Sequence, residues 1–376
     1  MKESERQLHV VSFDIPYPPD YGGVIDVFFK LKALVDAGVK IRLHCYEYGR
    51  ERSTELEALC HSVNYYKRRV FKNPFLGKLP YIVSSRNSEE LLENLSLDNA
   101  PILFEGLHSC YYLNHPSLKK RFRMVRTHNI EHHYYSNLEK VERNYFKKYF
   151  FRIEAEKLRK FEKMLQGSSS IAAISPSDES YLHKKYRKVF YLPAFHSNTS
   201  IISEPGRGEF VLYHGNLGVG ENNEAALYLV NRVFSKLENI PLVIAGNNPS
   251  RELKNAVLSN RNIQLHEDAG TDAIYGLIRD AHINVLPTFQ GTGIKLKLIN
   301  VLYRGRFCVA NETMVKNTGL EKLCTVRSDP DEMAASIKSL MNEEFTEAEL
   351  KSRYNALRKF DTVKNAGLLM NHLFKA

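Results

Sequence analysis

Segments typical of β-strands alternate with segments typical of helices from one end of this 376-residue sequence to the other. An apolar, β-branched run at residues 8–15 precedes a helical pattern at 24–37, and a second apolar run follows at 39–46. A strand, a helix and a further strand in this order are typical of a parallel sheet covered by helices. The sequence therefore predicts an α/β protein with doubly wound parallel sheets.

The same alternation continues through the rest of the chain, which is long enough for two α/β domains. In the first half we expect one long helix at about 141–165 and further strands at 63–66, 101–107, 124–127, 170–174 and 189–192. In the second half we expect strands at 209–214, 241–245, 262–266, 283–287, 306–310 and 324–326, with helices at 223–237, 272–280, 295–303 and 329–341 and two more after 346 and 362.

Residues 198–208 are polar, contain Ser, Pro and Gly, and lack apolar periodicity, so they are the best linker in the chain. The sequence thus predicts an N-terminal domain at 1–197, a linker at 198–208 and a C-terminal domain at 209–360. A terminal helix at 361–376 is expected to pack back toward the N-terminal domain. Ligands of such sheets bind at the carboxyl ends of the strands, so we expect the two domains to face a cleft.

The cysteines and the hydropathy pattern exclude several classes of protein. The five cysteines are scattered and form no CxxC pair, which favours a reducing compartment over a disulfide framework or a cysteine-ligated zinc site. No apolar run approaches the roughly 18 residues that a membrane span needs, and the polar start MKESERQLHV is unlike a secretory signal. We therefore expect a cytoplasmic protein.

The positive charge is concentrated in the first half of the chain. Of the net charge of +10, residues 1–200 carry +9, with basic clusters at 67–69, 119–121, 147–148 and 184–185. One interpretation is an ordinary solvated surface; the other is a surface that contacts anionic lipid or an acidic glycan acceptor. The second predicts a peripheral contact of the N-terminal domain with the inner face of a membrane. No nucleic-acid motif accompanies the charge, so nucleic acid is not an expected partner.

Two glycine-rich loops are candidates for binding phosphate. The first, PPDYGG, follows the first strand, where Gly22 and Gly23 permit a close backbone approach at a helix N-terminus. A tight turn without a ligand explains this loop as well, and it lacks the GxGxxG spacing. The second loop follows the strand at 283–287 and has the stronger pattern, because glycines, a helix start and two lysines coincide there. Its candidate residues are Gly291, Thr292, Gly293, Lys295 and Lys297.

Polar residues after three other strands complete the set of candidates. Asn216 lies in the turn after the strand at 209–214, where helix capping explains the asparagines about equally well. Glu105 ends one strand, and His128 and Asn129 follow another within RTHNIEHH. These three residues suit an active-site polar cluster or ordinary loop positions. A metal site is not expected, because no HExxH motif or distant carboxylate partner is evident.

In their order and spacing, these segments resemble the retaining glycosyltransferases of family 4, which have the GT-B fold of two Rossmann-like domains. The resemblance covers nearly the whole chain and is carried by PPDYGG, RTHNIEHHYY, AAISPSDESYL, LYHGNLGVGENNEAA, PLVIAGNNP and INVLPTFQGTGIKLKLINVLYRGRFCVAN. Where the family has an acidic residue before the glycine loop, this chain has Gln290. Where the family has a glutamate that holds the ribose, this chain has Asn300.

The resemblance implies transfer of a sugar from a nucleotide-diphosphate sugar to a glycan or lipid-linked acceptor, as in polysaccharide biosynthesis, with retention of configuration and without a metal or other cofactor. Both glycine loops would then bind the diphosphate, while Lys295 and Lys297 would stabilise the leaving group and His128 would contact the donor sugar. Gln290 and Asn300 would contact the nucleotide. Two alternatives stay open: a nucleotide-sugar epimerase with the same fold, and a catalytically silent subunit of a glycan-assembly complex.

Overall fold

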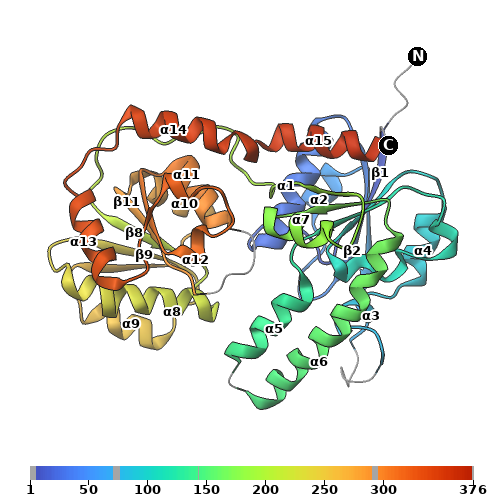
Figure 1. The fold of residues 1–376 in the computed structure, drawn as a ribbon, viewed down its shortest axis with the longest axis horizontal. Helices are drawn as coiled ribbons and strands as arrows, with labels where there is room; N and C mark the ends of the chain where they lie inside the picture. The colour runs from blue at the N-terminus through green and yellow to red at the C-terminus, as the bar shows by residue number, and fades with distance from the viewer. Residues whose placement is uncertain (1–5, 71–76, 143, 290–294, 375–376) are drawn as a thin grey trace. The chain divides into compact units, whose positions relative to one another are not determined.

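The computed structural model describes residues 6–70, 77–142, 144–289 and 295–374. The chain divides into two compact units (Figure 1). Unit 1 comprises the residues up to Ser197 together with the segment from Phe360 onward, and unit 2 comprises the described residues between Asn198 and Lys359. Each unit is built around its own parallel sheet.

The sheet of unit 1 has seven strands, in the order β3-β2-β1-β4-β5-β6-β7, and every neighbouring pair is parallel. The chain moves outward from β1 in one direction and then returns to β4 on the other side, which is the doubly wound arrangement. The strands are β1 (Gln7–Val11), β2 (Lys40–Glu47), β3 (Ser62–Lys67), β4 (Ile102–Glu105), β5 (Arg123–Thr127), β6 (Ser170–Ala173) and β7 (Val189–Tyr191).

The sheet of unit 2 has six parallel strands in the order β10-β9-β8-β11-β12-β13, with the same reversal of direction between β8 and β11. The prediction of two doubly wound parallel sheets is therefore confirmed. The strands are β8 (Val211–His214), β9 (Leu242–Gly246), β10 (Ile263–Glu267), β11 (Ile283–Leu286), β12 (Phe307–Ala310) and β13 (Thr325–Val326).

Helices connect the strands within each unit. Unit 1 contains α1 (Gly22–Asp36), α2 (Thr54–Leu59), α3 (Tyr81–Ser84), α4 (Glu89–Ser96), α5 (Glu131–Val141), α6 (Tyr145–Phe161), α7 (Pro176–His183) and α15 (Thr362–Phe374). Unit 2 contains α8 (Gly220–Tyr228), α9 (Arg251–Leu258), α10 (Thr271–Asp280), α11 (Leu296–Arg304), α12 (Glu312–Val315), α13 (Pro330–Leu340) and α14 (Glu347–Leu357).

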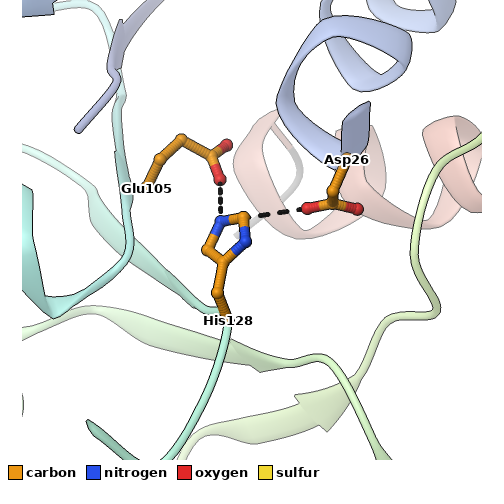
Figure 2. Close-up of side chains that lie close together, drawn as sticks. All are labelled: Asp26, Glu105 and His128. Carbon is orange, nitrogen blue, oxygen red and sulfur yellow. Dashed lines mark hydrogen bonds and ion pairs between the residues drawn. The ribbon is translucent and has the colours of Figure 1, made fainter. Parts of the chain in front are cut away.

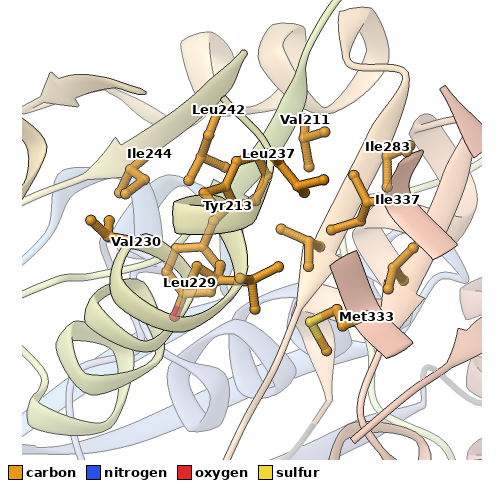
Figure 3. Close-up of a cluster of buried hydrophobic side chains, with 14 of the residues drawn as sticks. Val211, Tyr213, Leu229, Val230, Leu237, Leu242, Ile244, Ile283, Met333 and Ile337 are labelled. Carbon is orange, nitrogen blue, oxygen red and sulfur yellow. The ribbon is translucent and has the colours of Figure 1, made fainter. Parts of the chain in front are cut away.

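Alternate residues of each central strand enter opposite faces of the sheet, because side chains along a strand alternate in direction. In β4 of unit 1, Leu103 packs with α1, whereas Ile102 and Phe104 join the core on the other face. In unit 2, Val211 and Tyr213 of β8 lie in one apolar cluster with Met333 and Ile337 of α13 (Figure 3). Both faces are thus buried, which explains why the strands are almost continuously apolar.

The terminal helix α15 packs in unit 1, far in sequence from the rest of that unit. Its buried residues Ala366, Leu369 and Leu373 join the same apolar core as α1 and the strands β1 and β2. The ring of His372 stacks on Phe190 of β7, with ring centroids 3.7 Å apart.

The helices differ from the sequence prediction in several places, and α2, α3, α4, α5 and α12 are not among the expected helices. The expected single helix at about 141–165 is wrong at its start, because α5 ends at Val141 and α6 begins at Tyr145. Asn144, the N-cap residue of α6, accepts a hydrogen bond from the Lys147 amide and so begins a new helix. The segment 251–258, for which we expected no helix, is α9, capped by Ser250.

Among the helices of the described segments, none has the length and apolar character required to cross a membrane.

Candidate functional site

A network of buried charged side chains lies at the carboxyl ends of β4 and β5 in unit 1 (Figure 2). Glu105 is the last residue of β4, and His128 directly follows β5. Asp26 and Lys30 come from α1, one helical turn apart, and Arg126 comes from β5. All five side chains are buried.

Lys30 is the centre of this network. Its Nζ atom lies 2.9 Å from both carboxylate oxygens of Glu105 and 3.0 Å from Oδ2 of Asp26. Arg126 donates to Asp26 from Nε and Nη2 at 3.3 and 3.2 Å. His128 Nε2 lies 2.9 Å from Glu105 Oε2 and 3.9 Å from Asp26 Oδ2. The two carboxylates are therefore balanced by two cations.

The pKa values of the carboxyls reflect this balance. Burial alone would raise the pKa of Glu105, but the Lys30 ammonium and the hydrogen bond from His128 outweigh it and hold the pKa below its usual range. Burial is outweighed in the same way at Asp26, where Arg126 and Lys30 hold the pKa low. Both groups are ionised at neutral pH.

Asp26, Glu105 and His128 place one ligand atom each within 4.8 Å of one another, which is a spacing that could suit a metal ion. The donor set does not fit a divalent cation well, because the Lys30 ammonium already lies between the two carboxylates at hydrogen-bond distance. A cation there would have to displace Lys30 and would add charge to a neutral network.

His128 presents one ring nitrogen for further bonding. Glu105 can only accept, so Nε2 carries the hydrogen of their bond and Nδ1 is the acceptor in the neutral ring. Nδ1 is buried and, within the part of the chain that the structure describes, has no hydrogen-bond partner. The Phe13 ring packs edge-on against His128, with centroids 5.3 Å apart. The carboxylate thus fixes the ring in an orientation that suits a hydrogen bond from a hydroxyl group.

His108 packs against the same Phe13 ring as His128, and Glu131 lies next to His108. His108 Nδ1 is 3.8 Å from Glu131 Oε1, and Phe13 packs against both histidines. Gly106 has a φ of 71°, and a Cβ there would lie 3.0 Å from His108 Nδ1. Burial raises the pKa of Glu131 to about 8, and burial together with Arg86 lowers the pKa of His108. Both side chains therefore bring neutral polar groups to this edge of the sheet.

The wild-type protein is expected to lose folding stability as pH rises, because of Glu131. Replacing Glu131 with Gln is expected to abolish this part of the pH dependence. With a pKa of about 8 when folded and about 4.3 when unfolded, the Glu131 carboxyl binds its proton more tightly in the folded state. Stability therefore falls as pH rises from about 5 to 8, by roughly 3 kcal/mol for this group. Urea unfolding at both pH values should show this loss in the wild type and its absence in the variant. The same slope in both proteins would contradict it.

The PPDYGG loop of unit 1 is held by contacts within its own surroundings. Gly22 is the first residue of α1, and a Cβ on Gly23 would lie 2.8 Å from the Phe13 ring. Tyr21 donates to Asp14 at 3.0 Å, and Arg50 bonds Asp20 at 2.9 Å. The packing of Phe13 thus requires glycine at 23, independently of any ligand.

A second candidate site lies at the carboxyl ends of β8 and β11 in unit 2. Lys297, in the first turn of α11, donates to Asn222 Oδ1 at 2.5 Å and lies over the Tyr213 ring at 5.3 Å. A Cβ on Gly215 would come within 2.4 Å of Lys297 Nζ, so the absence of a side chain there lets the amine approach the β8 turn. Lys297 is consequently held at a helix N-terminus, where amides and dipole attract anions.

The electrostatics of this site favour a ligand with negative charge. Burial, reinforced by the nearby Lys295, lowers the pKa of Lys297 to about 8, although Glu221 opposes the shift. Burial also lowers the pKa of Lys295. His214 is buried beside Lys297, which together with burial lowers its pKa to about 3. Glu221 accepts a hydrogen bond from the Thr288 hydroxyl. The same carboxylate interacts with both lysines, so one negative charge faces two positive charges. An added anion would relieve this excess of positive charge.

Lys295 and Lys297 are two residues apart and would not share a face if both were helical. Lys295 is the N-cap residue of α11 and has non-helical φ and ψ, so the helical spacing does not separate the two side chains. Both amines interact electrostatically with Glu221.

The remaining predicted residues have varied surroundings. Asn300 accepts a hydrogen bond from Asn198 at 2.8 Å, and Asn198 accepts one from Arg304 at 2.6 Å. Asn216 shapes the turn after β8, where its Oδ1 accepts from the Gly218 amide at 3.1 Å. Asn129 is partly buried between β5 and α5. Gln290, Gly291, Thr292 and Gly293 lie outside the described residues.

Several site residues escaped the sequence analysis although a signal was present. Asp26 and Lys30 are an acid and a base at i and i+4, in a helix otherwise rich in apolar residues. Their burial beside Val27 and Leu31 was not foreseen. His214 and Glu221 carry no such signal, because their roles depend on the position of α11.

No model of a known protein family matches the chain. An uncharacterized 44.6 kDa protein in the cps region of Klebsiella pneumoniae is 28% identical over 336 residues, which cover 83% of this chain and 84% of that protein. HepE from Anabaena, solved in complex with UDP and glucose, aligns over 99% of this chain and 100% of its own, with a TM-score of 0.67 and 11% identity.

A variant of S. aureus TarM, solved with fondaparinux, alpha-GlcNAc-glycerol and UDP, aligns over 98% of this chain and 100% of its own. Its TM-score is 0.65 and its identity 10%. HepE and TarM are GT-B glycosyltransferases, and both match the chain over both parallel-sheet units. This chain has the GT-B fold. In GT-B terms, unit 1 is the N-terminal domain with the His128 network, and unit 2 is the C-terminal domain with the Lys297 site.

Proposed function

We propose that this GT-B protein is a glycosyltransferase that moves a sugar from a nucleotide-diphosphate sugar to a glycan or lipid-linked acceptor, with retention at the anomeric carbon and without a metal. The Lys297 site is the observation that carries the proposal. Two lysines and a bare glycine backbone meet at the N-terminus of α11, which is the chemistry that a diphosphate requires. The UDP bound in the HepE and TarM structures supports a nucleoside diphosphate as the ligand.

In the proposed reaction, the bond from the anomeric carbon to the diphosphate oxygen breaks and a bond from that carbon to the acceptor oxygen forms. The acceptor hydroxyl proton passes to the departing diphosphate. Negative charge grows on the leaving group, so fixed cations accelerate the reaction when they interact more strongly with the transition state than with the donor. Lys297 has this role, with Lys295 beside it. No nucleophile from the protein is required.

His128 is proposed to bind a hydroxyl of the donor sugar. Its Nδ1 atom is the buried acceptor described above, and Glu105 holds the ring in place from the opposite side. Asp26, Lys30 and Arg126 would act indirectly, because they position Glu105 and balance its charge. They are therefore positioning residues.

Assembly of a polysaccharide is the proposed setting. The relative in the cps region of Klebsiella pneumoniae supports it, as does the concentration of positive charge in the first 200 residues. We propose that the protein acts in the cytoplasm, with peripheral contact to the inner face of the membrane.

A survey of nucleotide sugars, read by product mass with lipid-linked acceptor fractions, tests the proposed function. Transfer to an acceptor supports it. Conversion of the nucleotide sugar without an acceptor would identify an epimerase instead. Absence of stabilisation by UDP or GDP at millimolar concentration in thermal unfolding would contradict nucleotide binding altogether, since a ligand that binds the folded state must stabilise it.

Replacing Gly215 with Ala is expected to weaken UDP binding about tenfold while leaving the fold intact. The added methyl carbon would lie 2.4 Å from Lys297 Nζ, so the amine must move away from the turn. Gly220→Ala is the matched control, because a Cβ there meets no atom within 4 Å. Calorimetric titration with UDP compares the two variants. Equal affinity in both would show that the position of Lys297 does not matter for the nucleotide.

A further inference from the structure

The helices α5 and α6 form an antiparallel hairpin in unit 1, and they lie side by side along their length (Figure 1). The C-terminal half of α6 is anchored in the unit, where Ala155, Leu158 and Phe161 are buried and Glu154 accepts a hydrogen bond from the Tyr81 amide at 2.6 Å. The other end of the hairpin has no such burial. Every residue from Asn144 to Tyr149 is exposed, and we call this segment the hairpin tip.

The hairpin tip concentrates large apolar side chains in solvent. Tyr145, Phe146 and Tyr149 have exposed fractions of 86%, 85% and 60%. A single exposed aromatic residue is ordinary in a soluble protein, but three within five consecutive residues form a patch. Since the anchored half of the same helix buries its apolar residues, a partner outside this unit best explains the patch.

The charges beside the aromatic residues indicate which partner. Lys147 and Lys148 lie between Phe146 and Tyr149, and both are exposed. The nearest acidic side chain in sequence, Glu142, accepts a hydrogen bond from the Asn144 amide at 2.8 Å. Aromatic rings next to lysines are typical of segments that enter the interface of an anionic bilayer. We propose that the hairpin tip docks unit 1 on a membrane surface that contains anionic lipid.

The other basic clusters of unit 1 are less suited to this contact. Arg121 is buried and bonded to Asp98 at 3.2 Å. Arg68 donates to Ser85 at 2.9 Å and stacks on Tyr48. Lys185 is paired with Glu162 at 2.8 Å. The remaining members of these clusters are exposed, but none of them is flanked in sequence by exposed aromatic residues as Lys147 and Lys148 are.

A second copy of this chain is a less suitable occupant of the patch. Residues 1–200 carry a net charge of +9, so two such surfaces would repel each other at the hairpin tip. An anionic bilayer instead attracts the lysines and accepts the rings at the headgroup level. This contact does not depend on sugar transfer, so it can be tested separately from the proposed function.

The chain contains no tryptophan, which allows a direct measurement. In Phe146→Trp the single indole reports the environment of the hairpin tip. We expect a blue shift of its fluorescence with vesicles that contain about a third phosphatidylglycerol, and quenching by brominated lipid. Vesicles of phosphatidylcholine alone should give little change. Tyr354→Trp, placed on the exposed face of α14 in unit 2, is the matched control and should not respond.

Cosedimentation of the full chain with the same vesicles measures the strength of the contact. Replacing Tyr145 and Phe146 with Ser should lower the partition coefficient at least tenfold, and replacing Lys147 or Lys148 with Ala should lower it about fivefold each. Tyr354→Ser should bind as the wild type does. Unchanged binding in the Ser double variant would overturn the proposal. A blue shift of the 146 reporter that follows protein concentration without lipid would also overturn it, in favour of self-association.

Discussion

Replacing Lys297 with Met is expected to lower kcat/KM for sugar transfer by about 100-fold to 1,000-fold while the protein stays folded. Methionine keeps most of the apolar volume of the lysine side chain but cannot stabilise charge on the departing diphosphate. The loss should exceed the effect on donor binding, because the amine interacts more strongly with the leaving group than with the intact donor. Steady-state rates with the donor and acceptor identified by the product survey measure both quantities.

Two features make the result specific to the charge of Lys297. The exposed Lys316 of the same unit is the control position, and Lys316→Met should leave the rate unchanged. UDP affinity of the wild type should fall as pH rises above about 8, because the uncomplexed Lys297 then loses its proton. The Met variant should lack that fall. A variant with wild-type kcat/KM would remove Lys297 from the proposed mechanism.

Replacing Lys30 with Met is expected to destabilise the protein by about 3–5 kcal/mol, the largest effect on stability that we predict. The ammonium is the shared partner of Asp26 and Glu105, and both carboxylates are buried. Its removal leaves an uncompensated negative charge in unit 1.

The double variant Lys30→Met/Glu105→Gln separates lost charge balance from lost packing. It removes one positive and one negative charge, so most of the stability should return. Urea unfolding of the wild type, both single variants and the double variant gives the coupling between the two positions. Additive losses would mean that the two side chains contribute to stability independently. That result would contradict the importance assigned to their 2.9 Å contact.

The fold could be predicted from the sequence because its main determinants are local. Apolar runs such as residues 39–46 and 283–287 read as buried parallel strands, and β2 and β11 lie there within one or two residues. The end of α5 at Val141 and the start of α6 at Tyr145 were not predicted, since they depend on one capping residue, Asn144.

The candidate site could be predicted only in part. Glu105, His128 and Lys297 follow strands or open a helix, which is where ligands bind in such sheets. Lys30 and Asp26 lie inside a helix, and nothing local says that they meet Glu105, which is 75 residues from Lys30. Asn300 is a candidate only through the resemblance to the family, and its bond to Asn198 joins α11 to the segment after unit 1. Such contacts depend on tertiary structure.

The placement of α15 has a consequence for how the protein is made on the ribosome. Ala366, Leu369 and Leu373 belong to the core that surrounds β1 and α1, yet they are translated after all of unit 2. In the nascent chain, an apolar strip of α1 therefore stays uncovered while about 160 further residues are added. Chaperones that hold apolar surfaces should associate with ribosomes during that interval and leave once α15 emerges.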